Sequence, residues 1–111
     1  MFEDDAVRTR HILDAAREAV GFVDGRTRED LDTDRMLSLS LVRLLEIIGE
    51  AARGVSAQLR EAHPDLPWKS MTGMRDRLIH GYFDVNLDVV WETVTQDLPS
   101  LVAQLETIVI D

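Results

Sequence analysis

The 111-residue sequence contains no cysteine, three histidines and few aromatic residues. Without cysteine the chain can form neither a disulfide framework nor a thiolate metal site, which is compatible with a reducing cytoplasm. His11, His63 and His80 show no ligand-like spacing, so we expect no metal and no other cofactor. No apolar run approaches the ~18 residues that a membrane span needs, and charges throughout residues 1–20 are unlike a signal peptide. We therefore expect a cytoplasmic protein with no membrane partner.

Basic residues are also scarce, because 12 Lys and Arg face 21 Asp and Glu, which gives a formal net charge of −9. This balance excludes a general nucleic-acid binder, since neutralising phosphates requires clustered Lys and Arg. Residues 53–80 are the exception, with five basic and three acidic side chains, whereas residues 81–111 contain no Lys or Arg. The acidic remainder favours a basic partner or serves solubility.

What the sequence has in abundance is helical periodicity, with apolar residues recurring at three- and four-residue steps. The pattern and its capping residues predict helices over 4–23, 28–32, 34–54, 56–62 and 68–80, and a last helix that Asn86 caps. We find no strand pattern, repeat or Gly-rich phosphate loop. A chain of this length and 45% hydrophobic content can bury one core. We predict a single all-α domain over 1–111, an up-and-down bundle of four to five helices.

The last helix carries an apolar seam of alternating four- and three-residue steps. Such a seam packs either in the core of its own bundle or against a helix of a second copy, and the sequence leaves both open. Its members are Leu87, Trp91, Val94, Leu98, Leu101, Leu105 and Ile108. Pro99 lies inside it, so we predict a kink near Thr95 or Gln96.

Residues 75–82 bring together three side chains that can cleave RNA without a metal. Arg75 offers a planar fork of donors to phosphate oxygens, and His80 can exchange a proton near neutral pH. Tyr82 adds a hydroxyl and a ring that can stack on a base. The alternative is structural: a helix end in which Arg77 covers apolar surface and His80 caps the last carbonyls.

The spacing restricts how Arg75 and His80 can meet. Residues five apart on a continuous helix point about 140° away from one another, so these two side chains would not share a face. They converge only if the helix stops near His80 and the chain turns back, which Gly81 would permit in a left-handed conformation. A symmetric dimer, in which each motif faces its twin, is a second route.

Two carboxylates one turn apart, Glu46 and Glu50, flank Gly49 on the predicted central helix. Such a pair can act as acid and base or as metal ligands, but the chain lacks the Glu-x-x-His units of di-iron bundles. We expect them instead to accept from Arg43, Arg53 or a motif arginine and so to fix the helix of the site. Gly49 is expected to allow a close helix approach.

These motifs together resemble the HepT-like ribonucleases, the toxin half of HepT–MntA toxin–antitoxin pairs in the HEPN superfamily. The resemblance rests on Arg75-x4-His80-x-Tyr82 and spans nearly the whole chain. It also includes segments 45–52, 67–68, 73–75, 80–84 and 97–99, with Trp91. Asp76 departs from the family pattern, in which a neutral polar residue is common at this position.

The resemblance implies an HEPN-like fold and a metal-independent endoribonuclease that cleaves tRNA or mRNA as a homodimer. Arg75 and His80 would be its catalytic residues, supported by Asp76, Arg77, Glu46 and Glu50. It also implies a partner, a minimal MntA-like nucleotidyltransferase antitoxin that silences the toxin by transferring AMP to Tyr82. Two alternatives stay open: a non-catalytic helical binding subunit of a nucleotidyltransferase complex, and a purely structural bundle.

Overall fold

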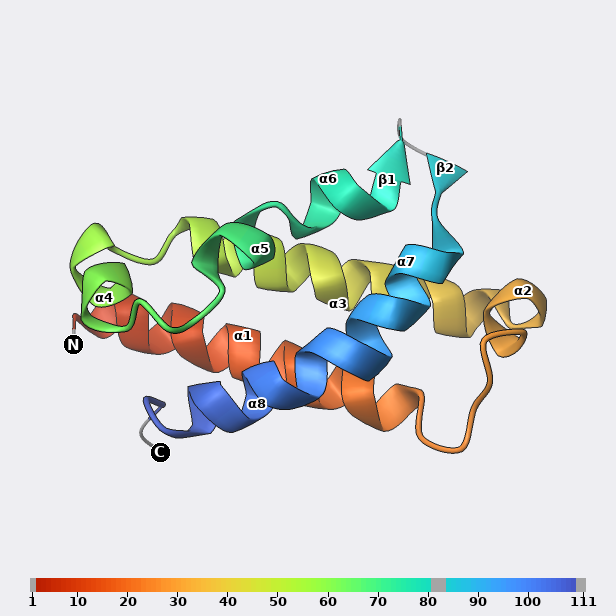
Figure 1. The fold of residues 1–111 in the computed structure, drawn as a ribbon, viewed down its shortest axis with the longest axis horizontal. Coiled ribbons are helices and arrows are strands. Elements are labelled where there is room, and N and C mark those ends of the chain that lie inside the picture. The colour runs from red at the N-terminus through yellow and green to blue at the C-terminus, as the bar shows by residue number, and fades with distance from the viewer. Residues whose placement is uncertain (1, 81–83, 110–111) are drawn as a thin grey trace.

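The computed structural model describes residues 2–80 and 84–109 of the chain. Four helical segments run up and down the long axis, joined at their ends by short helices (Figure 1). The first two are α1 (Glu3–Phe22) and α3 (Arg35–Arg53). The third comprises α5 (Trp68–Thr72) and α6 (Met74–Leu78), and the fourth α7 (Leu87–Glu92), the π-helical η1 (Thr93–Asp97) and α8 (Leu98–Glu106). The all-α bundle predicted from periodicity is confirmed.

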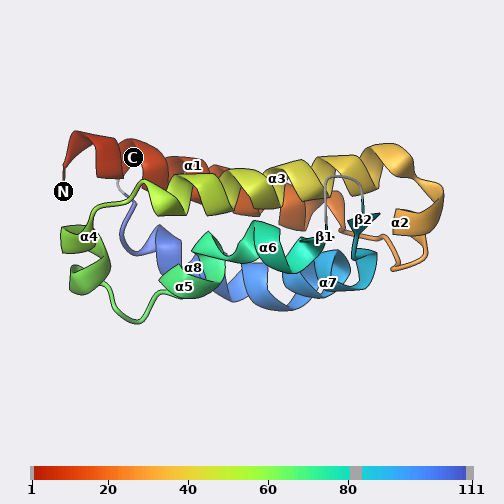
Figure 2. The same ribbon diagram turned by 90° about the horizontal axis from the view of Figure 1, so that it is seen from above.

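Short helices occupy the two ends of the bundle. Helix α2 (Asp30–Thr33) links α1 to α3, and α4 (Ala57–Ala62) links α3 to α5. Figure 2 shows α1 and α3 side by side as one layer, with the third and fourth segments beside them. The core between these segments is almost wholly aliphatic, with Ile12, Ala16, Leu41, Leu45, Ile48, Leu78, Val90, Val94, Leu98 and Leu105 all fully buried.

Helix boundaries follow the polar residues that the sequence offers as caps. The predicted N-caps Ser56 and Asn86 are confirmed, and Asp34, predicted as the first residue of the central helix, is also a cap: each side chain accepts a hydrogen bond from a backbone N–H three residues on. They are Asp34 for α3, Ser56 for α4 and Asn86 for α7. At the far end of α3, Arg60 donates from Nη2 to the carbonyls of Ala52 at 2.7 Å and Arg53 at 3.2 Å. The guanidinium thus satisfies orphan carbonyls at the negative end of the helix dipole.

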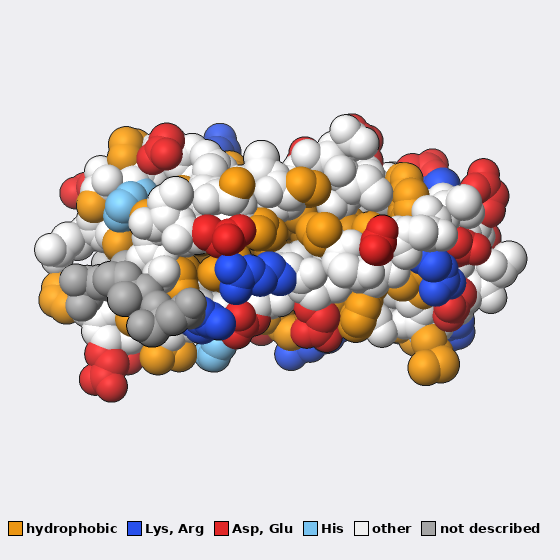
Figure 3. Space-filling view, turned by 90° about the horizontal axis from the view of Figure 1, so that it is seen from below, with side chains coloured by type: hydrophobic (Ala, Val, Ile, Leu, Met, Phe, Trp, Pro, Cys, Tyr) orange, Lys and Arg blue, Asp and Glu red, His pale blue; other side chains and the backbone are white. Residues whose placement is uncertain are grey.

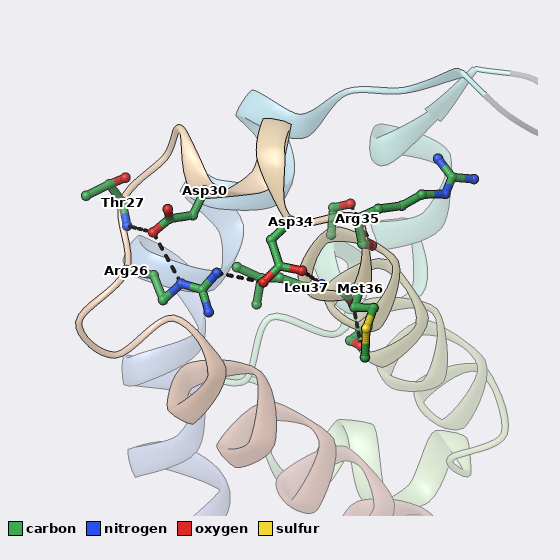
Figure 4. A network of polar contacts seen from close by, with 9 residues as sticks. Arg26, Thr27, Asp30, Asp34, Arg35, Met36 and Leu37 are labelled. Carbon is green, nitrogen blue, oxygen red and sulfur yellow. Dashed lines mark hydrogen bonds and ion pairs between the residues drawn. The ribbon is translucent and has the colours of Figure 1, made fainter.

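The turn between α1 and α3 is held by a polar network around Arg26 (Figure 4). Gly25 adopts φ +74°, a left-handed conformation that a residue with a side chain rarely adopts. Arg26 then donates to Asp34 at 2.8 Å and to Asp30 at 3.2 Å. The hydrogen bond to Asp34 is the main cause that raises the pKa of Arg26. The backbone N–H of Thr27 donates to Asp30 at 2.8 Å, which is one half of a capping box. Helix α2 begins at Asp30 and not at 28 as predicted.

Asp5 joins the start of α1 to the start of α4. Its side chain is only 3% exposed and accepts from the Ser56 backbone N–H at 2.9 Å and the Ser56 hydroxyl at 2.6 Å. The hydroxyl hydrogen bond is the largest cause that lowers the pKa of Asp5. A buried carboxylate with two good donors is stabilising, whereas one without donors would be costly.

The seam of the fourth segment packs into the bundle core. Val94, Leu98, Leu101 and Leu105 are buried, and Leu87, Trp91 and Ile108 pack against the core from its edge. Helical hydrogen bonding changes register at η1, directly before Pro99. Proline has no N–H to bond the carbonyl four residues back, at Thr95, so the irregularity falls where the sequence predicts it.

The segment 68–80 departs from the single helix predicted for it. The helix is interrupted at Gly73 and ends at Leu78, because Ile79 turns extended, with φ −117° and ψ 120°. Two short strands follow, β1 (Ile79–His80) and β2 (Asp84–Val85), paired antiparallel with His80 opposite Asp84. The backbone N–H of Asn86 donates to the Leu78 carbonyl at 2.7 Å and closes the base of this hairpin. Two-residue strands carry too little alternation to be recognised in a sequence.

One face of the bundle carries acidic and basic side chains side by side. Figure 3 shows the face formed by α1 and α8, where the basic groups in view lie beside acidic ones. Arg17 on α1, for example, lies 3.3 Å from Glu106 on α8. Within the described residues, no helix is both long and apolar enough to cross a bilayer.

Candidate active site

The predicted catalytic arginine lies on α6, where the third segment passes over α3. Arg75 is 49% exposed at its side chain, and its Nε lies 3.7 Å from Oε2 of Glu46 on α3. Glu46 is 24% exposed, so its carboxylate is partly shielded by the bundle. The ion pair positions the Arg75 guanidinium at the surface. Its Nε faces Glu46, and its other N–H groups can donate to an anion.

Close packing of α5 on α3 determines where α6 begins. A Cβ added to Gly49 would lie 3.2 Å from the Met71 carbonyl oxygen, tighter than most real contacts. The absence of a side chain at Gly49 therefore permits the close approach that the sequence predicts. Arg53 reinforces it by donating from Nε to the Thr72 carbonyl at 3.2 Å, at the last residue of α5.

The two predicted supporting glutamates serve different arginines. Glu46 meets Arg75, whereas Glu50 lies 3.6 Å from Arg43 with both side chains 60% exposed. Both glutamates form ion pairs with arginines, at separations longer than a hydrogen bond, and their supporting role stays a prediction. Only Glu46 is brought to the candidate site.

The chain reverses direction immediately after the motif helix. The backbone of His80 lies in β1, two residues beyond the end of α6, and β2 returns beside it. This is the helix stop and turn that allow Arg75 and His80 to converge. The prediction that the helix reaches His80 is wrong, because backbone pairing with β2 extends Ile79 and His80. The side chain of His80, and Gly81 and Tyr82 altogether, lie outside the described residues.

Four further residues surround the candidate site. Asp76 and Arg77 belong to the motif, and Asp84 and Arg28 were not predicted. Asp76 and Arg77 are both exposed on α6. Asp84 is the cross-strand partner of His80, which no periodicity in the sequence could indicate. Arg28 fixes the start of α7 by donating to Asp88 at 2.7 Å, across 60 residues of sequence, and Asp88 is the main cause that raises the pKa of Arg28. The hairpin is thus held between α6 and an anchored α7.

Sequence comparison shows the family to which this chain belongs. The model of the family described as "Ribonuclease HepT-like" matches residues 12–108. The chain belongs to the HepT-like ribonuclease family. The match includes the whole of α3, α6 and the hairpin, so it covers every element that forms the candidate site. The HepT-like chain is therefore an enzyme of a ribonuclease family.

Two curated relatives of this HepT-like chain match over nearly nine-tenths of their own length. It is 43% identical over 98 residues to "Putative RNase TTE0752" of Caldanaerobacter subterraneus subsp. tengcongensis, with 88% of each chain covered. It is 40% identical over 98 residues to "Probable ribonuclease HepT" of Thermococcus cleftensis, which covers 85% of this chain and 89% of that relative. No solved structure matches the chain significantly.

Proposed function

We propose that this chain is a metal-independent endoribonuclease, the toxin of a toxin–antitoxin pair, with Arg75 and His80 as its catalytic residues. One observation carries the proposal: Arg75, paired with Glu46, lies three residues before the end of α6 at Leu78, and the chain then reverses direction between β1, which holds His80, and β2. This geometry occurs in a chain of a ribonuclease family. Because the helix ends before His80, the two side chains need not diverge as residues five apart on one helix do, which supports the proposal.

The chemistry requires an attacking oxygen, a proton acceptor and stabilisation of charge on phosphate. The RNA 2′-hydroxyl or a water attacks phosphorus, and negative charge builds on the non-bridging oxygens. Arg75 binds those oxygens with the guanidinium edges that Glu46 leaves available. His80 takes the proton of the attacking oxygen or returns one to the leaving oxygen, a role that contributes typically ~10²–10⁴-fold.

A homodimer completes the proposed site. One histidine cannot easily serve as base and acid at the same time, whereas two motifs in one cleft supply both groups. Because the apolar seam of the fourth segment is used in the core, the dimer contact must involve another surface. Analytical ultracentrifugation at micromolar concentration should give about twice the chain mass of 12.6 kDa. A monomer that cleaves RNA at full rate would contradict the composite site.

The proposed partner is a minimal nucleotidyltransferase antitoxin that transfers AMP from ATP to Tyr82. The tyrosine oxygen attacks the α-phosphate, a phosphodiester forms on Tyr82, and pyrophosphate leaves. The added group brings bulk and negative charge two residues from His80, where it would occupy the place of the substrate phosphate. This proposal draws on the family resemblance and on Tyr82 being the chain's single tyrosine.

A second candidate function is a non-catalytic subunit that binds the nucleotidyltransferase. The exposed Asp76 next to Arg75 and the net charge of −9 favour it, because both oppose the approach of RNA. Protein purified without any antitoxin and incubated with tRNA in EDTA separates the two functions. Cleavage supports the ribonuclease, and intact tRNA at micromolar enzyme supports the binding subunit.

A further inference from the structure

A groove of about 440 Å³ lies between α3 and the hairpin that carries His80. This volume falls within the ~300–1,000 Å³ range of small-molecule sites. Glu46 lines the groove and also holds Arg75, so the groove begins beside the candidate catalytic arginine. Its polar lining residues are Arg35, Ser38, Glu46 and Asp84, and its apolar lining includes Leu39 and Val85.

The two sides of the groove differ in chemistry. Arg35 is an exposed cation at the start of α3, and Figure 4 shows its side chain extended away from Asp34, toward the segment with the hairpin. Leu39 and Val85 bring aliphatic surface from opposite walls, and Leu39 is 54% exposed. The carboxylates of Glu46 and Asp84 can accept hydrogen bonds but would repel a phosphate placed next to them. Inside the groove, where Arg35 is the basic lining residue, a phosphate is therefore expected at the Arg35 end.

A nucleotide of single-stranded RNA has matching parts. Its base is flat and apolar on both faces and carries amino donors at its edge for carboxylates, while its phosphate suits a guanidinium. Arg35 and Glu46 are separated by three turns of α3, about 16 Å along the helix, and Arg75 pairs with Glu46. The two arginines therefore suit two phosphates of one strand that are not adjacent. A flat base on the aliphatic lining would also cover the exposed Leu39 side chain.

We infer that this groove binds unpaired nucleotides of the RNA strand whose phosphodiester is held by Arg75, with Arg35 on a phosphate at the far end of the groove. The inference rests on the proposed ribonuclease function and assigns it a substrate class, single-stranded RNA. Arg35 and Ser38 are then binding residues, remote from the bond that is cut. Duplex RNA, whose bases are stacked and paired, does not fit the groove.

Two matched pairs of variants on α3 test the inference. Arg35→Ala removes the cation of the groove, and its control Arg43→Ala removes an exposed arginine that pairs with Glu50 outside it. Ser38→Phe fills the groove, and its control Ser40→Phe puts the same ring on a residue outside its lining. Both serines bond only to carbonyls of the preceding turn, Ser38 to Arg35 and Ser40 to Met36. The two serine variants therefore disturb the helix alike.

Binding is measured by fluorescence anisotropy of a labelled single-stranded heptamer containing all four bases. Its 2′-O-methyl groups remove the internal nucleophile, and gel electrophoresis after each titration verifies that the heptamer is intact, so that binding is read without cleavage. Wild-type protein should bind, Arg35→Ala about fivefold more weakly and Ser38→Phe about tenfold or more, since base contacts are worth ~1–3 kcal/mol. The two control variants should stay within about twofold of wild type. Circular dichroism shows whether each variant is folded. If Ser38→Phe does not fold, the comparison of Arg35→Ala with Arg43→Ala still tests the inference.

Three results would overturn the inference: no binding by wild type, equal effects within both pairs, or binding of a duplex as tight as that of the single strand. A fourth is a change of sedimentation in Ser38→Phe but not in Ser40→Phe, which would assign the groove to a contact between copies of the chain. A separate result would contradict the proposed ribonuclease function without contradicting the groove. If unmodified RNA is not cleaved in EDTA while binding of the heptamer still depends on Arg35 and Ser38, the result supports the binding groove and contradicts the ribonuclease proposal.

Discussion

The carboxylate of Glu46 on α3 and the guanidinium of Arg75 on α6 lie 3.7 Å apart, across the interface that joins the central helix to the motif helix. The contact is partly exposed on the arginine side and more shielded on the glutamate side. Screening limits what such a pair adds to the free energy of unfolding. Its consequence is positional, because it restricts where the arginine fork can point.

Removing the charge of Glu46 should therefore affect cleavage more than stability. Glu46→Gln keeps the size of the side chain but loses the ion pair, and we expect kcat/KM for RNA to fall about tenfold because the phosphate is less well positioned. Glu50→Gln is the matched control, since Glu50 pairs with Arg43 outside the site. Steady-state cleavage with denaturant unfolding tests this, and equal losses of activity in both variants would contradict it.

Protonation of Asp5 should make the fold sensitive to acid. Hydrogen bonds from Ser56 hold its pKa below the ordinary value, so the folded state binds its proton more weakly than the unfolded state. Its contribution is fully present above the unfolded pKa of ~3.9 and is lost as pH falls through the lower folded pKa. Urea unfolding should show Asp5→Ala less stable than wild type by about 1–3 kcal/mol at pH 7.

The difference between wild type and Asp5→Ala should shrink as pH is lowered below ~4, because the wild-type carboxylate then loses its charge. Asp14→Ala is a suitable control, since Asp14 is exposed at 54% of its side chain and pairs with Arg10 one turn away. A pH-independent difference for Asp5→Ala would show that the cavity, and not the charge, is responsible.

The two glycines of the long helices should respond in opposite ways to alanine. Gly21 in α1 has nothing within 4 Å of an added Cβ, so Gly21→Ala should stabilise the protein by up to ~1 kcal/mol through helix propensity. Gly49→Ala gains the same propensity but presses on the Met71 carbonyl at 3.2 Å, and we expect it to be no more stable than wild type. Thermal unfolding measures both, and an equal gain in stability would show that the approach of α5 is not limited at Gly49.

Much of this fold is encoded locally and could be predicted. Asp34, Ser56 and Asn86 mark helix starts because their side chains accept from the first turn, and Pro99 marks the irregular turn at η1 because it lacks an N–H. The site depends on pairs distant in sequence, and such pairs leave no periodic signal. The short hairpin of β1 and β2 and the bond from Arg28 to Asp88 became visible only in three dimensions. Glu46 was predicted as an acceptor, but only the fold selects Arg75 as its donor.

Silencing by the proposed antitoxin should depend on the Tyr82 hydroxyl. Co-expression with the cognate nucleotidyltransferase should give an inactive protein that is heavier by an adenylyl group, and the modified peptide should contain Tyr82. Tyr82→Phe keeps the ring but removes the acceptor oxygen, so cells should lose protection even with antitoxin present. If Tyr82→Phe is still silenced, inhibition runs through binding alone.

Cleavage of RNA in the presence of EDTA is the most direct test of the central claim, that Arg75 and His80 cut RNA without a metal. Protein purified without antitoxin should cleave tRNA at the same rate with and without EDTA. Arg75→Ala and His80→Ala should each lower the rate by about 10² or more while circular dichroism shows an intact fold. Cleavage that persists in His80→Ala, or that disappears from the wild type when EDTA is added, would contradict the account.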